Sequence, residues 1–355
     1  MIKKTFKKLT AYIPQVFIIV ICLWGFIFHP EKIGNGVSKG LILTAQKIIP
    51  SLFPFMVFAS CLSKTYFFHL LSVKLEKVTR KIFRISGIGF SAVLLGLLGG
   101  YPVGAKAVAD TYKQGLISED EARRLFIWCA NPSPAFVISA VGVFMFSSYR
   151  CGIILYVSSL MSALVMGFFT RFFADTKTKT PKAPSFSPAR NILVNSVSET
   201  GETLLGICGW LLTSCGISSL AELLIRKKGV LTFINCITEV TSACEIASDI
   251  SLPLPVISAI LGFGGFAVIL QILTYMKTCK VPVRIFICTK ILNGALSAFF
   301  CSVLLKIFPQ SAPVYATITY SDHVLPISHN ILTAVILLIM CLVFVLEVDN
   351  KRKLC

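Results

Sequence analysis

Long stretches without a single charged residue limit what this chain can fold into. Ala11 to Phe28 and Ile331 to Leu346 are uncharged and strongly apolar, and each approaches the roughly 20 residues that an α-helix needs to cross the hydrocarbon core of a bilayer. Of the 355 residues, 55% are hydrophobic and only 14% are charged, whereas about a quarter of the residues in a soluble domain are charged. We therefore expect an all-α, polytopic membrane protein with broken or re-entrant helices.

The distribution of charge predicts an orientation in the membrane. The chain has 34 Lys and Arg against 16 Asp and Glu, a net charge of +18, and the basic residues gather in short segments beside apolar runs. Cytoplasmic loops have this pattern, so the expected partner of the charge is the lipid bilayer and not nucleic acid. Basic residues near both ends, and a loop at 309–330 without Lys or Arg, predict a multi-pass protein of the cell (inner) membrane with cytoplasmic termini. The cluster Arg226 to Lys228 would then lie outside, against this rule.

Hydropathy along the chain predicts about eight to ten spans or half-spans. Glu31 to Lys47 is too polar to cross and is expected to lie in the membrane interface. A polar helix is expected over Lys106 to Arg124, with Ser118 and Glu121 in the form of a capping box. Asp175 to Arg190 is a basic, proline-rich linker. The interior spans are expected at Pro50–Leu71, Leu125–Phe146, Cys151–Phe173, Leu204–Ile225, Leu254–Tyr275 and Ile285–Ile307.

The two sides of the linker resemble each other. Leu95 to Gly100 (LGLLGG) is echoed by Leu261 to Gly265 (LGFGG), and Asn131-Pro132 by Asn293-Gly294. One unit is expected to begin outside and the other inside, which is the inverted repeat of many secondary transporters. The expected division is 1–36 for the N-terminal tail and first transmembrane helix, 37–174 for the first repeat, 175–190 for the cytoplasmic linker, 191–308 for the second repeat, and 309–355 for the outer loop, last helix and basic tail.

The glycines at Gly99 to Gly104 have the spacing of a phosphate-binding loop, but Ala105 precedes Lys106 and no hydroxyl follows. Glycine and proline at membrane depth instead free backbone groups that lipid cannot satisfy, so such breaks face protein or a watery cavity. The alternative is close packing of helices through small residues. The predicted helix-break residues are Gly99, Gly100, Tyr101, Pro102, Gly104, Pro132, Pro134, Gly264 and Gly265.

The stretch from Gly96 to Phe146, with GYPVGAK followed by an acidic helix start and the CANPSP break, resembles the nucleoside-recognition (Gate) domain of the YlbJ-type sporulation integral membrane proteins. The segment LTFINCITEVTSACEIAS is similar to the Glu-Val-Thr segment of that family. Ala130 stands where a second polar amide is usual. The resemblance implies two Gate-like repeats in an inner-membrane protein needed for endospore formation. Since Gate domains also occur in nucleoside and ferrous-iron transporters, it implies that a small solute crosses or is sensed.

Six polar residues are candidates for contact with a solute or a coupling ion. Asn131 can donate and accept hydrogen bonds, and its alternative role is to cap the helix break. Glu239 at membrane depth should face a cavity, pair with a base or carry a proton; the alternative is a place at the water interface. The candidates are Asn131, Ser133, Glu239, Thr241, Ser242 and Asn293.

No catalytic set, metal site or cofactor motif is recognisable, and the 13 cysteines form no CxxC pair. The chain is therefore not expected to be an enzyme. The predicted function is transport or gating of a small polar solute, nucleoside-like or an ion, by alternating access, with a cation or proton as coupling partner. The alternatives are a structural or assembly protein of the spore envelope and a small-solute channel; homo-oligomers and other sporulation membrane proteins stay open as partners.

Overall fold

The computed structural model describes residues 20–174, 191–225, 227–279 and 281–308, which contain helices and no strand. The predicted all-α class is thus confirmed. Predictions for residues 1–19, 175–190 and 309–355 lie outside the described residues. Residues 20–28 are helical, and the elements that follow are α2 (Pro30–Leu43), η1 (Thr44–Ile48), α3 (Ile49–Ser63), α4 (Tyr66–Ile82), α5 (Gly87–Gly99), α6 (Tyr101–Lys113), α7 (Glu119–Trp128), η2 (Ala135–Met145), α8 (Tyr149–Thr170), η3 (Arg171–Phe173), α9 (Ile192–Leu224), α10 (Lys228–Thr238), α11 (Val240–Asp249), α12 (Leu254–Phe263), α13 (Gly265–Met276), η4 (Lys277–Cys279) and α14 (Val283–Ile307).

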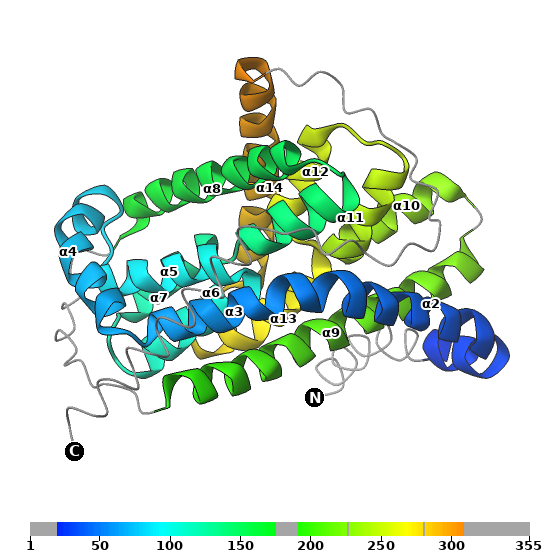
Figure 1. Cartoon of the computed structure of the whole chain (residues 1–355), viewed down its shortest axis with the longest axis horizontal. Coiled ribbons are helices and arrows are strands. Elements are labelled where there is room, and N and C mark those ends of the chain that lie inside the picture. Colours follow the sequence, from blue (N-terminus) through cyan, green and yellow to red (C-terminus); the bar gives the residue numbers. More distant parts are fainter. Residues whose placement is uncertain (1–19, 175–190, 226, 280, 309–355) are drawn as a thin grey trace, which may run out of the picture.

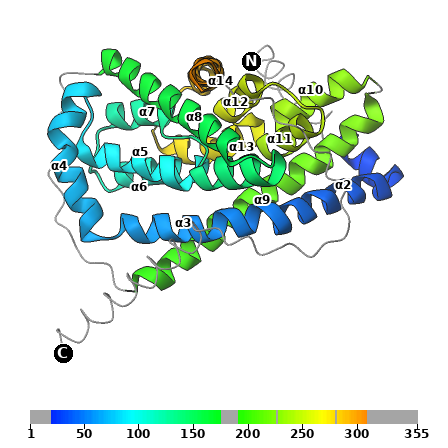
Figure 2. The same ribbon diagram turned by 45° about the horizontal axis from the view of Figure 1, so that its top comes forward.

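The longest helices form a frame around the shorter ones (Figure 1). α8 lies along one edge, α9 along the opposite edge, α2 and α3 lie between them, and α14 crosses their direction. α4 closes one end of this frame in both views (Figures 1 and 2). α14 packs against α8 and α12, while α2 and α3 pack against α9. The shorter helices α5, α6, α7, α12 and α13 supply much of the buried core.

Five helices in the described residues are long and apolar enough to cross a membrane, and the pair α4–α5, bent by 97°, makes a sixth if it counts as one span. Their outer faces carry large apolar side chains, among them Leu205 at 74% and Phe299 at 59% exposure. A soluble protein rarely exposes such surfaces, but lipid accepts them. The five are Pro30–Ser63, Tyr149–Phe173, Ile192–Leu224, Leu254–Cys279 and Val283–Ile307.

Glu31 to Lys47 does not form a helix of its own, and its predicted position in the membrane interface stays a prediction. Pro30–Ser63 is one continuous helix of 34 residues, with a π-helical turn at Thr44–Ile48 directly before Pro50. Proline removes a backbone donor and crowds the turn before it. The wider π-helical turn, in which Ile49 N–H bonds the carbonyl of Thr44, accommodates that proline without ending the helix.

The predicted polar helix over Lys106 to Arg124 is in fact two helices, α6 and α7, joined by a turn with Gly115 at φ +69°. Ser118 caps α7 as expected, because its Oγ accepts a hydrogen bond from Glu121 N at 3.1 Å. Glu121 does not complete the capping box. Its carboxylate accepts hydrogen bonds from both N and Oγ of Ser86 at 2.6 Å, so it joins α7 to the start of α5.

Four short breaks interrupt helices inside the frame. They fall at Gly100 between α5 and α6, at residues 129–134 between α7 and η2, at Glu239 between α10 and α11, and at Gly264 between α12 and α13. Gly100 has φ +97° and Gly264 has φ +83°, a region that glycine enters without steric cost. Helices end at these glycines and at 131–134, where the sequence places breaks, whereas the break at Glu239 was not predicted. The division into inverted repeats stays a prediction.

Asn293 does not mirror the break at Asn131, because α14 runs unbroken through it. No proline follows Asn293 within α14, whereas Pro132 and Pro134 closely follow Asn131, and the missing N–H groups of those prolines end the helix. The sequence match between the two asparagines therefore does not extend to local structure.

Gly104 lies inside α6 and serves close helix packing. A Cβ built on Gly96 or on Gly104 would collide with the carbonyl oxygen of Cys129. The alternative role for the glycines, close approach of helices through small residues, thus applies at Gly104, while Gly100 provides the break itself.

Replacing Gly100 with alanine tests whether the first break requires glycine. The alanine would be held at φ +97° with its Cβ 3.3 Å from Cβ of Ser133, so we expect Gly100→Ala to lower the free energy of unfolding by about 1–2 kcal/mol. Thermal unfolding in detergent measures this. The control is Gly201→Ala in α9, where a Cβ meets nothing within 4 Å, and it should leave stability equal or slightly higher. Equal melting midpoints for both variants would contradict the assignment.

Candidate functional site

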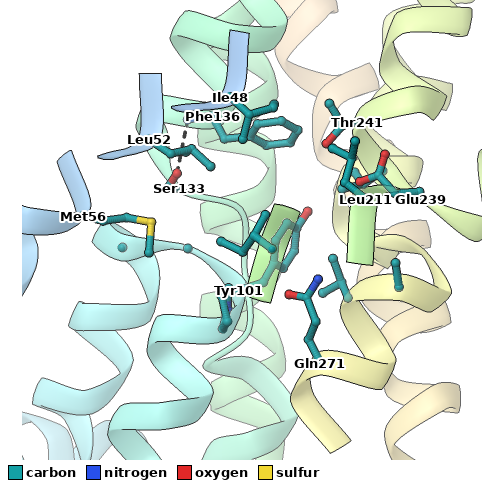
Figure 3. Close-up of a pocket in the computed structure, with 17 residues that line it drawn as sticks. Ile48, Leu52, Met56, Tyr101, Ser133, Phe136, Leu211, Glu239, Thr241 and Gln271 are labelled. Carbon is teal, nitrogen blue, oxygen red and sulfur yellow. Dashed lines mark hydrogen bonds between the residues drawn. The ribbon is translucent and has the colours of Figure 1, made fainter. Parts of the chain in front are cut away.

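A cavity of about 50 Å³ lies where the helix breaks meet (Figure 3). The first break contacts the second, since a Cβ on Gly100 would lie 3.3 Å from Cβ of Ser133. A Cβ on Gly264 would lie 3.2 Å from the Tyr101 ring, and one on Gly265 would lie 3.3 Å from Cα of Glu239. Breaks from both sides of the linker are therefore in contact with one another around this cavity. Its polar lining residues are Tyr101, Ser133, Glu239, Thr241 and Gln271, and the rest of the lining is glycine, proline and apolar side chains.

The prolines of the second break leave two carbonyls without a helical partner. Pro132 and Pro134 have no N–H, so the carbonyls of Trp128 and Ala130, four residues before them, cannot be bonded within the helix. Asn131 Nδ2 donates to Trp128 O at 2.6 Å. The carbonyl of Ala130 accepts a hydrogen bond at 2.8 Å from Nζ of a lysine on α14, Lys290. Side chains thus replace both missing donors.

The carbonyls at the end of α12 are satisfied in the same way. The hydroxyl of Tyr101 donates to Leu261 O at 2.6 Å, and Nδ2 of Asn293 donates to Gly262 O at 2.9 Å. The oxygen of the Asn293 amide accepts a hydrogen bond from Ser162 Oγ of α8 at 2.6 Å. Tyr101 from α6 and Asn293 from α14 therefore satisfy the free carbonyls at the break between α12 and α13.

Two side chains that line the cavity also cap the helices that begin at the breaks. Ser133 Oγ accepts a hydrogen bond from Phe136 N at 3.2 Å, and the Glu239 carboxylate accepts one from Ser242 N at 2.6 Å. A carboxylate is favoured at a helix N-terminus because it lies at the positive end of the helix dipole. Glu239 is only 6% exposed, and none of the ion pairs among the described residues includes it. Its carboxyl group thus lines the cavity without a basic partner among the described ion pairs.

Half of the residues predicted to contact a solute line the cavity. Those that do are Ser133, Glu239 and Thr241. Those that do not are Asn131, Ser242 and Asn293. The two asparagines are buried and bind carbonyls of the breaks, which is the capping role set beside the binding role for Asn131. Contact with a solute stays a prediction for all six residues.

The predicted helix-break residues divide in a similar way. Those in the cavity lining are Gly99, Gly100, Tyr101 and Pro102. Those outside it are Gly104, Pro132, Pro134, Gly264 and Gly265. The second group shapes the wall from behind, since Pro132 and Pro134 end α7 and the two glycines allow α13 to begin beside Glu239.

Two polar residues were missed in the sequence. Gln271 of α13 lines the cavity together with Tyr101 (Figure 3), and Lys290 is 1% exposed in α14. Each is an isolated polar residue inside a predicted span, and such residues usually face a bundle interior or a cavity. The sequence analysis applied this rule only to the acidic residue Glu239, although it holds equally for Gln271 and Lys290.

The cavity can hold a few water molecules or a small ion. At about 50 Å³ it is smaller than the several hundred Å³ of a typical ligand pocket, so a nucleoside would require a wall to move outward. A carboxylate, hydroxyl groups and one amide provide ligands for a hydrated or protonated guest. Among the described residues, no group of three His, Cys, Asp or Glu side chains is placed to hold a metal ion.

Apolar helices long enough to span a bilayer, apolar outer faces and breaks satisfied inside the bundle define the chain as a multi-pass helical membrane protein. It is similar to the sporulation integral membrane protein YlbJ of Bacillus subtilis (strain 168), with 26% identity in an alignment that covers 79% of each chain. This confirms the resemblance to the YlbJ-type sporulation integral membrane proteins, and the Gate domain stays a prediction. No family model and no solved structure matches the chain.

Removing the hydroxyl of Tyr101 tests the connection between the two helix breaks. Tyr101→Phe leaves the buried carbonyl of Leu261 without its donor, so the free energy of unfolding should fall by about 1–3 kcal/mol. Thermal unfolding in detergent checks it. Tyr112→Phe, in the same helix but with a half-buried side chain, should change stability by less than about 0.5 kcal/mol. If both variants have the same melting temperature, the hydrogen bond to Leu261 contributes nothing to stability.

Proposed function

We propose that the protein moves or gates a small polar solute, an ion or a nucleoside-like molecule, across the cell membrane by alternating access and without catalysing a reaction. The observation that supports this is the cavity where helix breaks from both sides of the linker meet, with the buried carboxylate of Glu239 on its wall. Transporters place substrate and coupling-ion sites at broken helices of this kind. The similarity to a sporulation membrane protein suggests that transport serves spore formation.

Glu239 is the residue we propose for coupling. A carboxylate at membrane depth is costly unless it meets a cation or takes up a proton, and Glu239 has no basic partner among the described ion pairs. Thr241 beside it and Gln271 across the cavity add an oxygen and an amide. We propose that Asn131, Ser242 and Asn293 hold the walls of the cavity, and their direct contact with a solute stays a prediction.

The arrangement of the helix ends supports a cytoplasmic position for the linker, as expected from the charge, and cytoplasmic termini stay part of the proposal. The end of α8, the start of α9 and α4 lie at the same end of the molecule (Figures 1 and 2). α4 carries four basic residues, Lys74, Lys77, Arg80 and Lys81, and basic residues concentrate on the cytoplasmic side of a membrane. The linker 175–190, which connects α8 to α9, is assigned to that side in this proposal.

A structural role in the spore envelope is the second candidate, and one observation favours it. The polar residues that end the breaks are bound to carbonyls of the protein itself, as with Asn131, Asn293 and Tyr101. A scaffold needs such a closed interior, whereas a transporter must be able to open it. The two roles make different demands on Glu239, because a scaffold needs only its capping hydrogen bond.

Glu239→Gln separates transport from a scaffold role. Glutamine keeps the shape and a carbonyl oxygen to cap α11 but has no charge, so loss of a charged contact should lower flux about tenfold or more at an unchanged protein level. The assay is uptake of radiolabelled uridine and of sodium into vesicles that contain the purified protein. The matched control is Glu202→Gln, which removes an exposed carboxylate on α9 and should transport like the parent protein.

Spore yield provides the complementary measurement. In a Bacillus subtilis strain that lacks YlbJ, the parent chain and the Glu202→Gln variant should restore heat-resistant spores, and Glu239→Gln should not. If Glu239→Gln restores spores fully while vesicles with the parent protein take up neither probe, the scaffold role is correct and the transport proposal is wrong.

A further inference from the structure

Lys290 is a buried lysine that the proposed site does not use. It lies inside α14, a helix apolar enough to span a membrane, and only 1% of its surface is exposed. Lysine is almost never fully buried unless its charge is paired. Its surroundings must therefore account for that charge.

The contacts of Lys290 are one carbonyl and one aromatic ring. Nζ donates to Ala130 O at 2.8 Å and lies 5.5 Å from the centroid of the Tyr101 ring, within the range of a cation–π interaction. None of the ion pairs among the described residues includes Lys290. No carboxylate thus fixes its charge, and the main partner of the ammonium is a backbone oxygen.

The carbonyl oxygen of Ala130 has the properties of a cation ligand at a helix break. Ala130 follows the end of α7, and Pro134 removes the donor that its carbonyl would have in a helix. Helix C-terminal ends carry partial negative charge, and unwound carbonyls at such ends coordinate coupling cations in transporters with broken helices. A free monovalent cation could bind at this carbonyl, and the side-chain ammonium of Lys290 occupies that position instead.

We propose that the ammonium of Lys290 takes the place of a bound cation at the Ala130 carbonyl and that proton binding to its amine controls whether the 129–134 break is held against α14. This rests on the proposed function, for which it names the proton as coupling ion. Protonated Lys290 makes a charge-assisted hydrogen bond to Ala130 O, and that bond weakens when the amine gives its proton to water. The break is then free to move, and with it Ser133 on the cavity wall.

Lys290 acts through the break and through Tyr101, since it is not among the residues that line the cavity. The titratable groups that face it are the Tyr101 ring on α6 and the Cys129 thiol beside the break. α12 carries no titratable side chain. The other titratable residues on elements packed against α14 are Glu119, Asp120, Glu121, Arg123 and Arg124 in the first turns of α7, and Tyr149, Arg150, Cys151 and Tyr156 on α8.

Fluorescence of Trp128 reports on this switch without any transport assay. Trp128 is 1% exposed and ends α7 directly before the break. In the full-length protein with Trp24→Phe and Trp210→Phe, a titration from about pH 6 to about pH 10 should show a transition in emission. Lys290→Met, which is neutral, and Lys290→Arg, which stays charged throughout, should both abolish that transition.

Two controls make the titration decisive. Lys306→Met removes an exposed lysine from the same helix and should keep the transition, as should Cys129→Ala. If Lys290→Met does not fold, Lys290→Arg carries the test because it preserves the charge. A transition that persists in Lys290→Arg, or that is absent in the parent protein, overturns the proposal.

A flux measurement connects the switch to transport. In sodium-free vesicles loaded with a pH-sensitive dye, uridine uptake by the parent protein should follow an imposed pH gradient, and Lys290→Arg should lose that dependence. Uptake that requires sodium and is unaffected by Lys290→Arg contradicts the role of Lys290 alone. No uptake by the parent protein under any gradient contradicts the transport function, and the Trp128 titration still decides whether Lys290 controls the break.

Discussion

A backbone carbonyl that leaves its helix inside an apolar bundle must find another donor, and most of this structure follows from that need. Water is scarce at this depth, and an unsatisfied group there costs several kcal/mol. Four breaks separate successive helices of the chain, and side chains supply the missing hydrogen-bond donors. Asn131 and Lys290 serve the break at 129–134, while Tyr101 and Asn293 serve the end of α12. These hydrogen bonds connect α6 and α14 to breaks that lie far away in the sequence.

The same requirement explains where the candidate site lies. Helix starts at a break present free N–H groups, and a serine and a glutamate satisfy them, Ser133 at η2 and Glu239 at α11. Both side chains end at the cavity because the starts of these helices point into it. The polarity of the cavity is therefore a consequence of ending helices there. A solute that enters would compete with the caps for the same groups, which connects binding to the shape of the backbone.

The fold class could be predicted from the sequence because uncharged runs leave few alternatives, and three of the breaks could be predicted because glycine and proline act locally. What could not be predicted depends on partners distant in the chain. Pro50 appeared to start a new helix, but a π-helical turn carries the helix through it. Asn131 and Asn293 looked like binding residues, and only the fold shows that their amide nitrogens donate to backbone carbonyls. Lys290 was readable as a charge within a span, although its partner, the carbonyl of Ala130, is 160 positions away.

The spacing of two residues on α14 has a mechanical consequence. Lys290 and Asn293 are one turn apart, about 4.5 Å along the axis, yet they hold breaks on opposite sides of the linker. A sliding or rolling of α14 strains both hydrogen bonds at once, so a movement of this helix affects both halves of the protein together. A helix that holds both breaks favours a concerted rearrangement of the two halves over a sequence of independent steps.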